Sequence, residues 1–121
     1  MIKIKRAYDP VEPGDGFRVL VDRLWPRGVT RDELKLDSWQ RDVAPSDALR
    51  KSYHHDVSRW DEFKTSYVAE LESNQEALGL LLEMAGTGDV SLEFAASDTE
   101  HNNAVVLKEY LESRLGTQMP L

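Results

Sequence analysis

The chain has 121 residues, 40% of them hydrophobic, which is typical of a single domain spanning residues 1–121 with one core. Its 15 basic and 22 acidic side chains give a formal net charge of −7, which argues against general coating of DNA or RNA. The absence of cysteine excludes disulfides and thiol catalysis. No apolar run reaches the roughly 18 residues of a membrane span, and the N-terminal sequence lacks the apolar region of a signal peptide. We therefore expect a soluble cytoplasmic protein without a membrane partner.

The first part of the chain predicts two strands joined by a loop. Residues 2–6 alternate apolar and polar side chains, which is typical of a half-exposed edge strand. Residues 7–16 are rich in Pro, Gly and Asp and predict the loop. Residues 17–21 are an almost continuous run of β-formers, which predicts a strand buried on both faces. The loop is short for a crossover between parallel strands, so the relative direction of the two strands stays open.

Capping residues and 3.6-residue periodicity predict helices in the middle of the chain. Residues 36–39 lie between the first two helices and predict a packed connector. The first is a short turn that Thr30 caps and that ends at Leu34, and the second runs from Ser46 to about Tyr53. The third runs from Arg59 to about Leu71 and is capped by Asp56 or Ser58. The fourth runs from Ser73 or Asn74 to Gly86.

The last part of the chain predicts a third strand and a final helix. Residues 90–96 place Val90, Leu92 and Phe94 on one face, with Ser91 and Glu93 on the other. The capping-box spacing of residues 97–100 predicts a helix that starts there and ends near Leu115, before a frayed tail over residues 117–121.

This order of elements predicts a small α/β domain with a mostly parallel sheet of few strands, flanked by helices in Rossmann-like layers. The strands at residues 17–22 and 90–96 should lie side by side, with their carboxyl ends at the same edge of the sheet, because both lead into polar loops.

The loop after the first buried strand carries charged side chains around Trp25 and Pro26. Open α/β sheets bind ligands at this position, and the forked guanidinium groups of Arg23 and Arg27 match a phosphate or a carboxylate. The alternative is that both arginines form structural ion pairs with nearby carboxylates. Asp22, at the strand end, is a candidate base or an anchor for the loop.

The loop after the third strand carries a second polar group. The helix phase places Glu100 and Asn103 toward the sheet, His101 at the edge of the apolar arc, and Asn102 away from it. Buried polar side chains need hydrogen-bond partners, which are either the loop backbone or a ligand held together with the arginines. We take Asp98, Asn102 and Asn103 as candidate ligand-binding residues, and Asp22, Glu100 and His101 as candidates for proton transfer.

His55 and Asp56 are secondary candidates, because a His beside a carboxylate favours proton transfer or metal binding. The alternative is that they fix the junction between two helices. Adjacent histidines do not share a helix face, and no pattern supplies a third ligand, so the sequence predicts neither a metal site nor a cofactor.

Four blocks of the chain resemble the YeaO-like branch of the family called domain of unknown function 488. The resemblance implies a compact α/β domain of the bacterial cytoplasm with no established activity. Longer relatives have a Cys-His-Arg-like turn where this chain has Asn102, Asn103 and Ala104. Within the branch, Gly and Pro are usual where this chain has His54 and Val57. The four blocks are residues 21–28, 44–51, 55–63 and 101–104.

Two functional hypotheses follow. The first is a site between the two polar loops for an anionic, phosphate-bearing small molecule such as a nucleotide, with or without catalysis. The second is a non-catalytic interaction or regulatory protein in which the arginines and asparagines form a purely structural network. An open polar cleft with both arginines directed into it favours the first, and arginines locked in ion pairs favour the second. The sequence does not indicate an oligomeric state.

Overall fold

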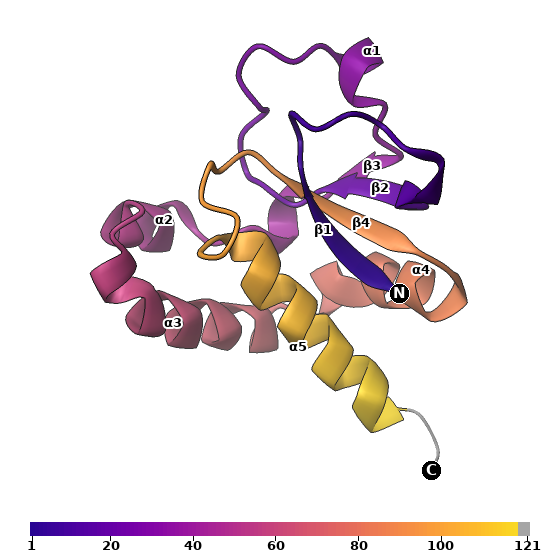
Figure 1. Ribbon diagram of the computed structural model, residues 1–121. Helices are drawn as coiled ribbons and strands as arrows, with labels where there is room; N and C mark the ends of the chain where they lie inside the picture. The colour runs from indigo at the N-terminus through magenta and orange to yellow at the C-terminus, as the bar shows by residue number, and fades with distance from the viewer. Residues whose placement is uncertain (119–121) are drawn as a thin grey trace.

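The structure is a computed structural model that describes residues 1–118. A four-stranded sheet in the order β1-β4-β2-β3 forms its centre, and every pairing within it is parallel. The predicted α/β class and parallel sheet are therefore confirmed. The first strand, whose direction the sequence left open, runs parallel to β4 at one edge of the sheet (Figure 1). The strands are β1 (Ile2–Arg6), β2 (Phe17–Leu20), β3 (Ser38–Trp39) and β4 (Val90–Phe94).

The strand β3 corrects the prediction of a packed connector at residues 36–39. It is two residues long and pairs with β2 through Val19 opposite Ser38 and Leu20 opposite Trp39. Two residues carry no alternating pattern, so the pairing is determined by the neighbouring strand rather than by local sequence.

The first three helices begin close to their predicted positions, whereas the fourth begins at Gly79 rather than at Ser73 or Asn74, because residues 75–78 form a 3₁₀ turn. The hydroxyl of Thr30 accepts a hydrogen bond from the backbone of Glu33, and that of Ser46 accepts one from Leu49, so both predicted caps are confirmed. A short 3₁₀ turn precedes each of the next two helices, and Asp56 caps the first of these turns. The helices are α1 (Arg31–Leu34), α2 (Asp47–Tyr53), α3 (Trp60–Glu72), α4 (Gly79–Thr87) and α5 (Asn103–Gln118).

The last helix starts later than predicted. The Asp98 carboxylate accepts hydrogen bonds from the backbone N–H groups of Glu100 (2.9 Å) and His101 (3.0 Å), so residues 97–102 form a turn. Such side-chain to backbone bonds compete with helix formation, which is why the predicted capping box was wrong. The helix also passes the predicted end near Leu115 and continues to Gln118. Residues 119–121 of the predicted frayed tail lie outside the described residues.

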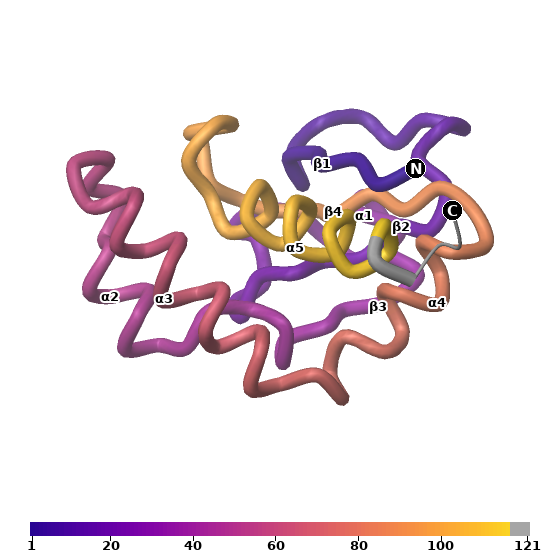
Figure 2. The backbone as a smooth tube through the Cα atoms, turned by 90° about the horizontal axis from the view of Figure 1, so that it is seen from below, coloured from indigo at the N-terminus to yellow at the C-terminus, as the bar shows by residue number. Residues whose placement is uncertain are grey.

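The longer helices cover one face of the sheet. Figures 1 and 2 show α3, α4 and α5 on the same side, with α5 beside β1 and β4. Fully buried side chains of this face, such as Val19 and Leu92, form one cluster with Tyr67 of α3, Leu81 of α4 and Leu107 of α5. Removing this apolar surface from water stabilises the fold. No helix within residues 1–118 is long and apolar enough to cross a membrane.

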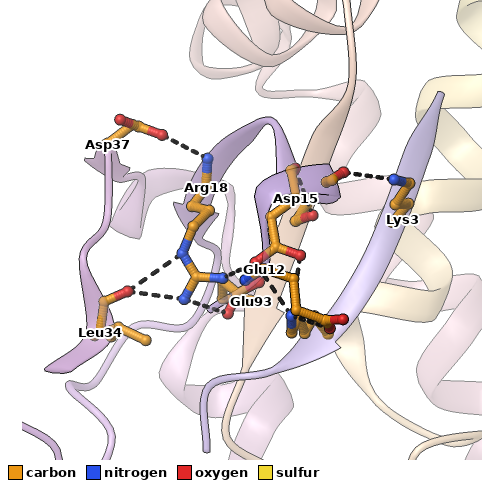
Figure 3. A network of polar contacts seen from close by, with 10 residues as sticks. Lys3, Glu12, Asp15, Arg18, Leu34, Asp37 and Glu93 are labelled. Carbon is orange, nitrogen blue, oxygen red and sulfur yellow. Dashed lines mark hydrogen bonds and ion pairs between the residues drawn. The ribbon is translucent and has the colours of Figure 1, made fainter. Parts of the chain in front are cut away.

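The opposite face of the sheet carries a network of buried charges beneath the 7–16 loop and α1 (Figure 3). Arg18 forms ion pairs with Asp15 and with Glu93 (3.2 Å), and Lys5 pairs with Asp15 at 3.0 Å. Neither carboxylate oxygen of Glu93 accepts a hydrogen bond within residues 1–118. Burial raises the pKa of Glu93 to about 7, although the Arg18 charge opposes this. Arg18 also donates to the carbonyl of Leu34 (2.8 Å), which ties α1 to this face.

Candidate functional site

A pocket of about 340 Å³ opens at the carboxyl ends of β2 and β4, which are neighbours as predicted. Both polar loops contribute to its wall, through residues 22–27 and through Ala95, Ala96, Asn102 and Asn103. A third group of lining residues was not predicted as part of the site, apart from His55. This group consists of Tyr8, Ala44, Pro45, Arg50, Tyr53, His55 and Phe63.

Asp22 anchors the two strand ends to each other. One carboxylate oxygen accepts a hydrogen bond from the backbone N–H of Ala95 (2.9 Å), and the other accepts one from the side-chain amide of Asn103 (3.0 Å). Burial raises the pKa of Asp22, while these two hydrogen bonds and the nearby His55 oppose that rise. The geometry matches the anchor interpretation of Asp22 more closely than the role of a base.

The two candidate arginines line the pocket but differ in what holds them. Arg23 donates to the carbonyls of Ala44 and Pro45, both at 3.2 Å, so it fastens the loop after β2 to the segment before α2. Arg27 is exposed, and its guanidinium has no hydrogen bond or ion pair within residues 1–118. Neither arginine forms an ion pair within residues 1–118, so the predicted alternative of structural ion pairs is not observed.

The two candidate asparagines also divide the roles between them. Asn103 donates to the carbonyl of Val21 (3.1 Å) as well as to Asp22, so it faces the sheet edge as its helix phase predicts. Asn102 is 2% exposed, which contradicts the prediction that it points away from the core. Its oxygen caps α5 by accepting from Val105 N–H (3.1 Å), and its amide donates to the carbonyl of Asp98 (2.9 Å).

The remaining candidates of the second loop lie outside the pocket lining. Glu100 is exposed and lies three residues before α5, which starts at Asn103, so the prediction that Glu100 faces the sheet was wrong. His101 stands edge-on to Trp60, with ring centres 5.2 Å apart, and its Nδ1 lies 3.0 Å from the Asp98 carboxylate. Hydrogen bonds from the turn backbone, with burial opposing them, lower the pKa of Asp98.

The two secondary candidates separate in the structure. His55 lines the pocket in a left-handed backbone conformation, with φ of 55°, directly after His54 with φ of 44°. Asp56 is exposed and accepts hydrogen bonds from the backbone and hydroxyl of Ser58 (3.1 and 2.7 Å). The part of the chain that the structure describes contains no group of three His, Asp or Glu side chains suited to hold a metal ion.

The sequence did not predict that α2 contributes Arg50 and Tyr53 to the pocket wall. Arg50 lies on an exposed helix face and pairs with Asp47 at 3.2 Å, while Tyr53 and Phe63 stack with ring centres 4.5 Å apart. One signal pointed toward Arg50, because it lies in the 44–51 block of the family resemblance. No local pattern marks Tyr53 or Tyr8, since only the folded chain brings them to the sheet edge.

The sequence is similar to a known protein family. A family model described as the inactive DUF488-N3 subclade matches residues 1–120. The chain belongs to this family. Together with the relatives described next, this match confirms the resemblance to the YeaO-like branch.

Relatives in two bacterial genera match nearly the whole chain. The uncharacterized protein YeaO of Escherichia coli is 41% identical over 112 residues, which cover 93% of this chain and 97% of YeaO. The uncharacterized proteins Mb3100c of Mycobacterium bovis and Rv3073c of Mycobacterium tuberculosis are each 39% identical over 113 residues, covering 93% of this chain and 95% of theirs. No solved structure matches the chain.

Proposed function

We propose that the pocket at the carboxyl ends of β2 and β4 binds a small phosphate-bearing ligand, such as a nucleotide, without converting it. The observation that carries this proposal is the charge of the pocket. The whole chain has a net charge of −7, yet Arg23, Arg27 and Arg50 line the pocket and Asp22 is its one acidic lining residue within residues 1–118. A local excess of positive charge on an acidic protein favours an anionic ligand.

Arg27 is the residue best placed to hold the anion. The hydroxyl of Tyr8 donates to its backbone carbonyl (3.0 Å), so the main chain is held while the exposed guanidinium has no protein partner in the described chain. Arg50 forms an exposed ion pair with Asp47, and exposed pairs of this kind contribute little to stability. A phosphate is therefore able to draw Arg50 away from Asp47 at small cost.

Binding without catalysis is supported by the side chains that the pocket lacks. Asp22 joins the two strand ends through Ala95 and Asn103, and the other candidates for proton transfer, Glu100 and His101, do not line the pocket. The chain has no cysteine, and Asn102 stands within the turn where longer relatives have a Cys-His-Arg-like sequence. The matching family is itself described as inactive.

Titration calorimetry with inorganic phosphate tests the proposal. Arg27→Ala should weaken binding about tenfold or more, since a hydrogen bond to a charged group contributes roughly 1.5–3 kcal/mol. Arg31→Ala is the matched control, because Arg31 is also an exposed arginine but does not line this pocket. Absence of saturable binding to the wild-type protein would refute the proposed function. Equal affinity of wild type and Arg27→Ala would exclude Arg27 as a ligand.

A further inference from the structure

Asp22 is the acidic side chain in the wall of the pocket, and His55 lies near it. Each of its oxygens accepts one hydrogen bond, from Ala95 and from Asn103, and no ion pair engages it within residues 1–118. A carboxylate has about four acceptor sites, so two remain. Asp22 is half-buried and lines the pocket, so a ligand there lies next to this side chain. A ligand group that donates hydrogen bonds would stabilise the negative charge of Asp22.

Aromatic side chains form part of the pocket wall, among them Trp25, Tyr53 and Phe63. Tyr53 stacks on Phe63, with ring centres 4.5 Å apart. The indole N–H of Trp25 donates to the carbonyl of Val29 (2.7 Å), and its ring meets Trp39 edge-on at 5.4 Å. Flat apolar walls favour a flat ring in the ligand. The volume of about 340 Å³ is near the low end for ligand pockets, which suits a single mononucleotide.

We infer that the ligand is a guanine mononucleotide whose base donates to Asp22 while its phosphate contacts Arg27. This inference rests on the proposed function. Guanine presents a ring N–H and an amino group side by side, and this pair matches the two oxygens of a carboxylate. Adenine and cytosine place a ring acceptor next to their amino group, and uracil places carbonyl oxygens on both sides of its ring N–H. Each of these edges brings a lone pair against the carboxylate.

A series of ligands on the wild-type chain tests the inference without altering the protein. Calorimetric titration with GMP, IMP, AMP and inorganic phosphate should give the tightest binding for GMP. IMP lacks the amino group and should bind about tenfold more weakly or worse, because one hydrogen bond to a charged acceptor is lost. AMP should bind no better than IMP. Equal affinities for GMP and AMP would overturn the inference.

The outcomes separate this inference from the proposed function. If inorganic phosphate binds and no nucleotide binds more tightly, the guanine assignment is wrong and the phosphate site stands. If neither phosphate nor any nucleotide binds, the proposed function fails and the inference fails with it.

Asp22→Asn replaces one acceptor by a donor and should remove the preference for GMP over AMP while phosphate still binds. Asp98→Asn, outside the pocket lining, is the control and should keep the preference. Asp22 also joins the two strand ends, so the folding of each variant is checked by circular dichroism. A folded Asp22→Asn protein that retains the full preference for GMP would contradict the inference. If this variant does not fold, the ligand series on the wild type decides.

Discussion

The side-chain amide of Asn103 donates to the carboxylate of Asp22 at 3.0 Å, across a separation of 81 residues. The same amide reaches the carbonyl of Val21, and the second carboxylate oxygen accepts from Ala95 at the end of β4. One amide and one carboxylate therefore join the ends of two parallel strands to the first turn of α5. The pocket lies against this junction, so its shape depends on both residues.

We predict that Asn103→Leu lowers the free energy of unfolding by about 1–3 kcal/mol, because it leaves buried partners of the amide unpaired. Leucine has a similar volume, so the loss reports the hydrogen bonds rather than a cavity. Urea titration measures the difference. A variant as stable as the wild type would mean that the amide has no structural role and is held ready for a ligand instead.

Asn102 should act as the N-cap of α5. Asn102→Ala removes the oxygen that accepts from Val105 and should cost about 0.5–2 kcal/mol of stability. Asn102→Asp keeps this acceptor and places negative charge at the helix N-terminus, so it should recover part of the loss. Thermal and urea unfolding of the two variants check this. Equal destabilisation by alanine and aspartate would show that the cap is unimportant.

Stability should fall as the pH rises through neutrality, because of Glu93. Burial raises its pKa from 4.5 to about 7 in the folded protein, so the folded state retains a proton that the unfolded chain releases. The resulting stabilisation is fully present below pH 4.5 and is lost as the pH rises through 7. We expect a loss of roughly 2–3 kcal/mol between about pH 5 and pH 8, measured by urea unfolding.

Glu93→Gln is the control for this prediction, because glutamine does not ionise. The neighbouring Asp15 and Lys5 have pKa values shifted away from this range. Hydrogen bonds and opposite charges outweigh burial at both groups, so the pKa of Asp15 is lowered and the pKa of Lys5 is raised. The stability difference between Glu93→Gln and wild type should therefore grow in favour of the variant as the pH rises. Parallel pH profiles for the two proteins would show that Glu93 is ionised throughout.

Gly16→Ala should destabilise the fold by more than about 1 kcal/mol. Gly16 has φ of 66°, and a Cβ atom there would lie 2.2 Å from the backbone oxygen of Asp89. Gly14→Ala is the matched control in the same loop, because the nearest atom to its Cβ would be the flexible Lys3 amine at 3.8 Å. Comparable stability of the two variants by urea unfolding would contradict the described packing of the 7–16 loop against β4.

Local sequence patterns predict the parts of the fold that local interactions determine. The alternation along β1, the buried run of β2 and the caps at Thr30 and Ser46 each depend on neighbours within a few residues. By contrast, β3 forms because it pairs with the free edge of β2, and a segment of two residues is too short for its own sequence to predict this pairing. The start of α5 was misplaced because Ser97 and Asn102 are both good caps, and the turn bonds of Asp98 decide between them.

The sequence predicted the part of the candidate site that lies at the carboxyl ends of the parallel strands, because the sheet determines the position of those residues. Asp22 and Asn103 follow two strands whose carboxyl ends must share an edge, so their proximity follows from the fold class. The contribution of α2 was not predictable in this way. Arg50 and Tyr53 reach the pocket through the packing of α2 on α3, and no periodicity of the chain encodes which loop a helix end will face.

The proposed anion site lies in the pocket between the two strand-end loops. Titration of ¹⁵N-labelled protein with inorganic phosphate, followed by amide chemical shifts, tests it directly. We predict saturable shifts for Arg27, Ala95, Asn103 and the indole N–H of Trp25, with little change at Lys64 of α3, which pairs with Glu109 at 2.8 Å and does not line the pocket. Shifts confined to lysines away from the pocket, such as Lys64, or the absence of saturable shifts around the pocket, would contradict the proposed anion site.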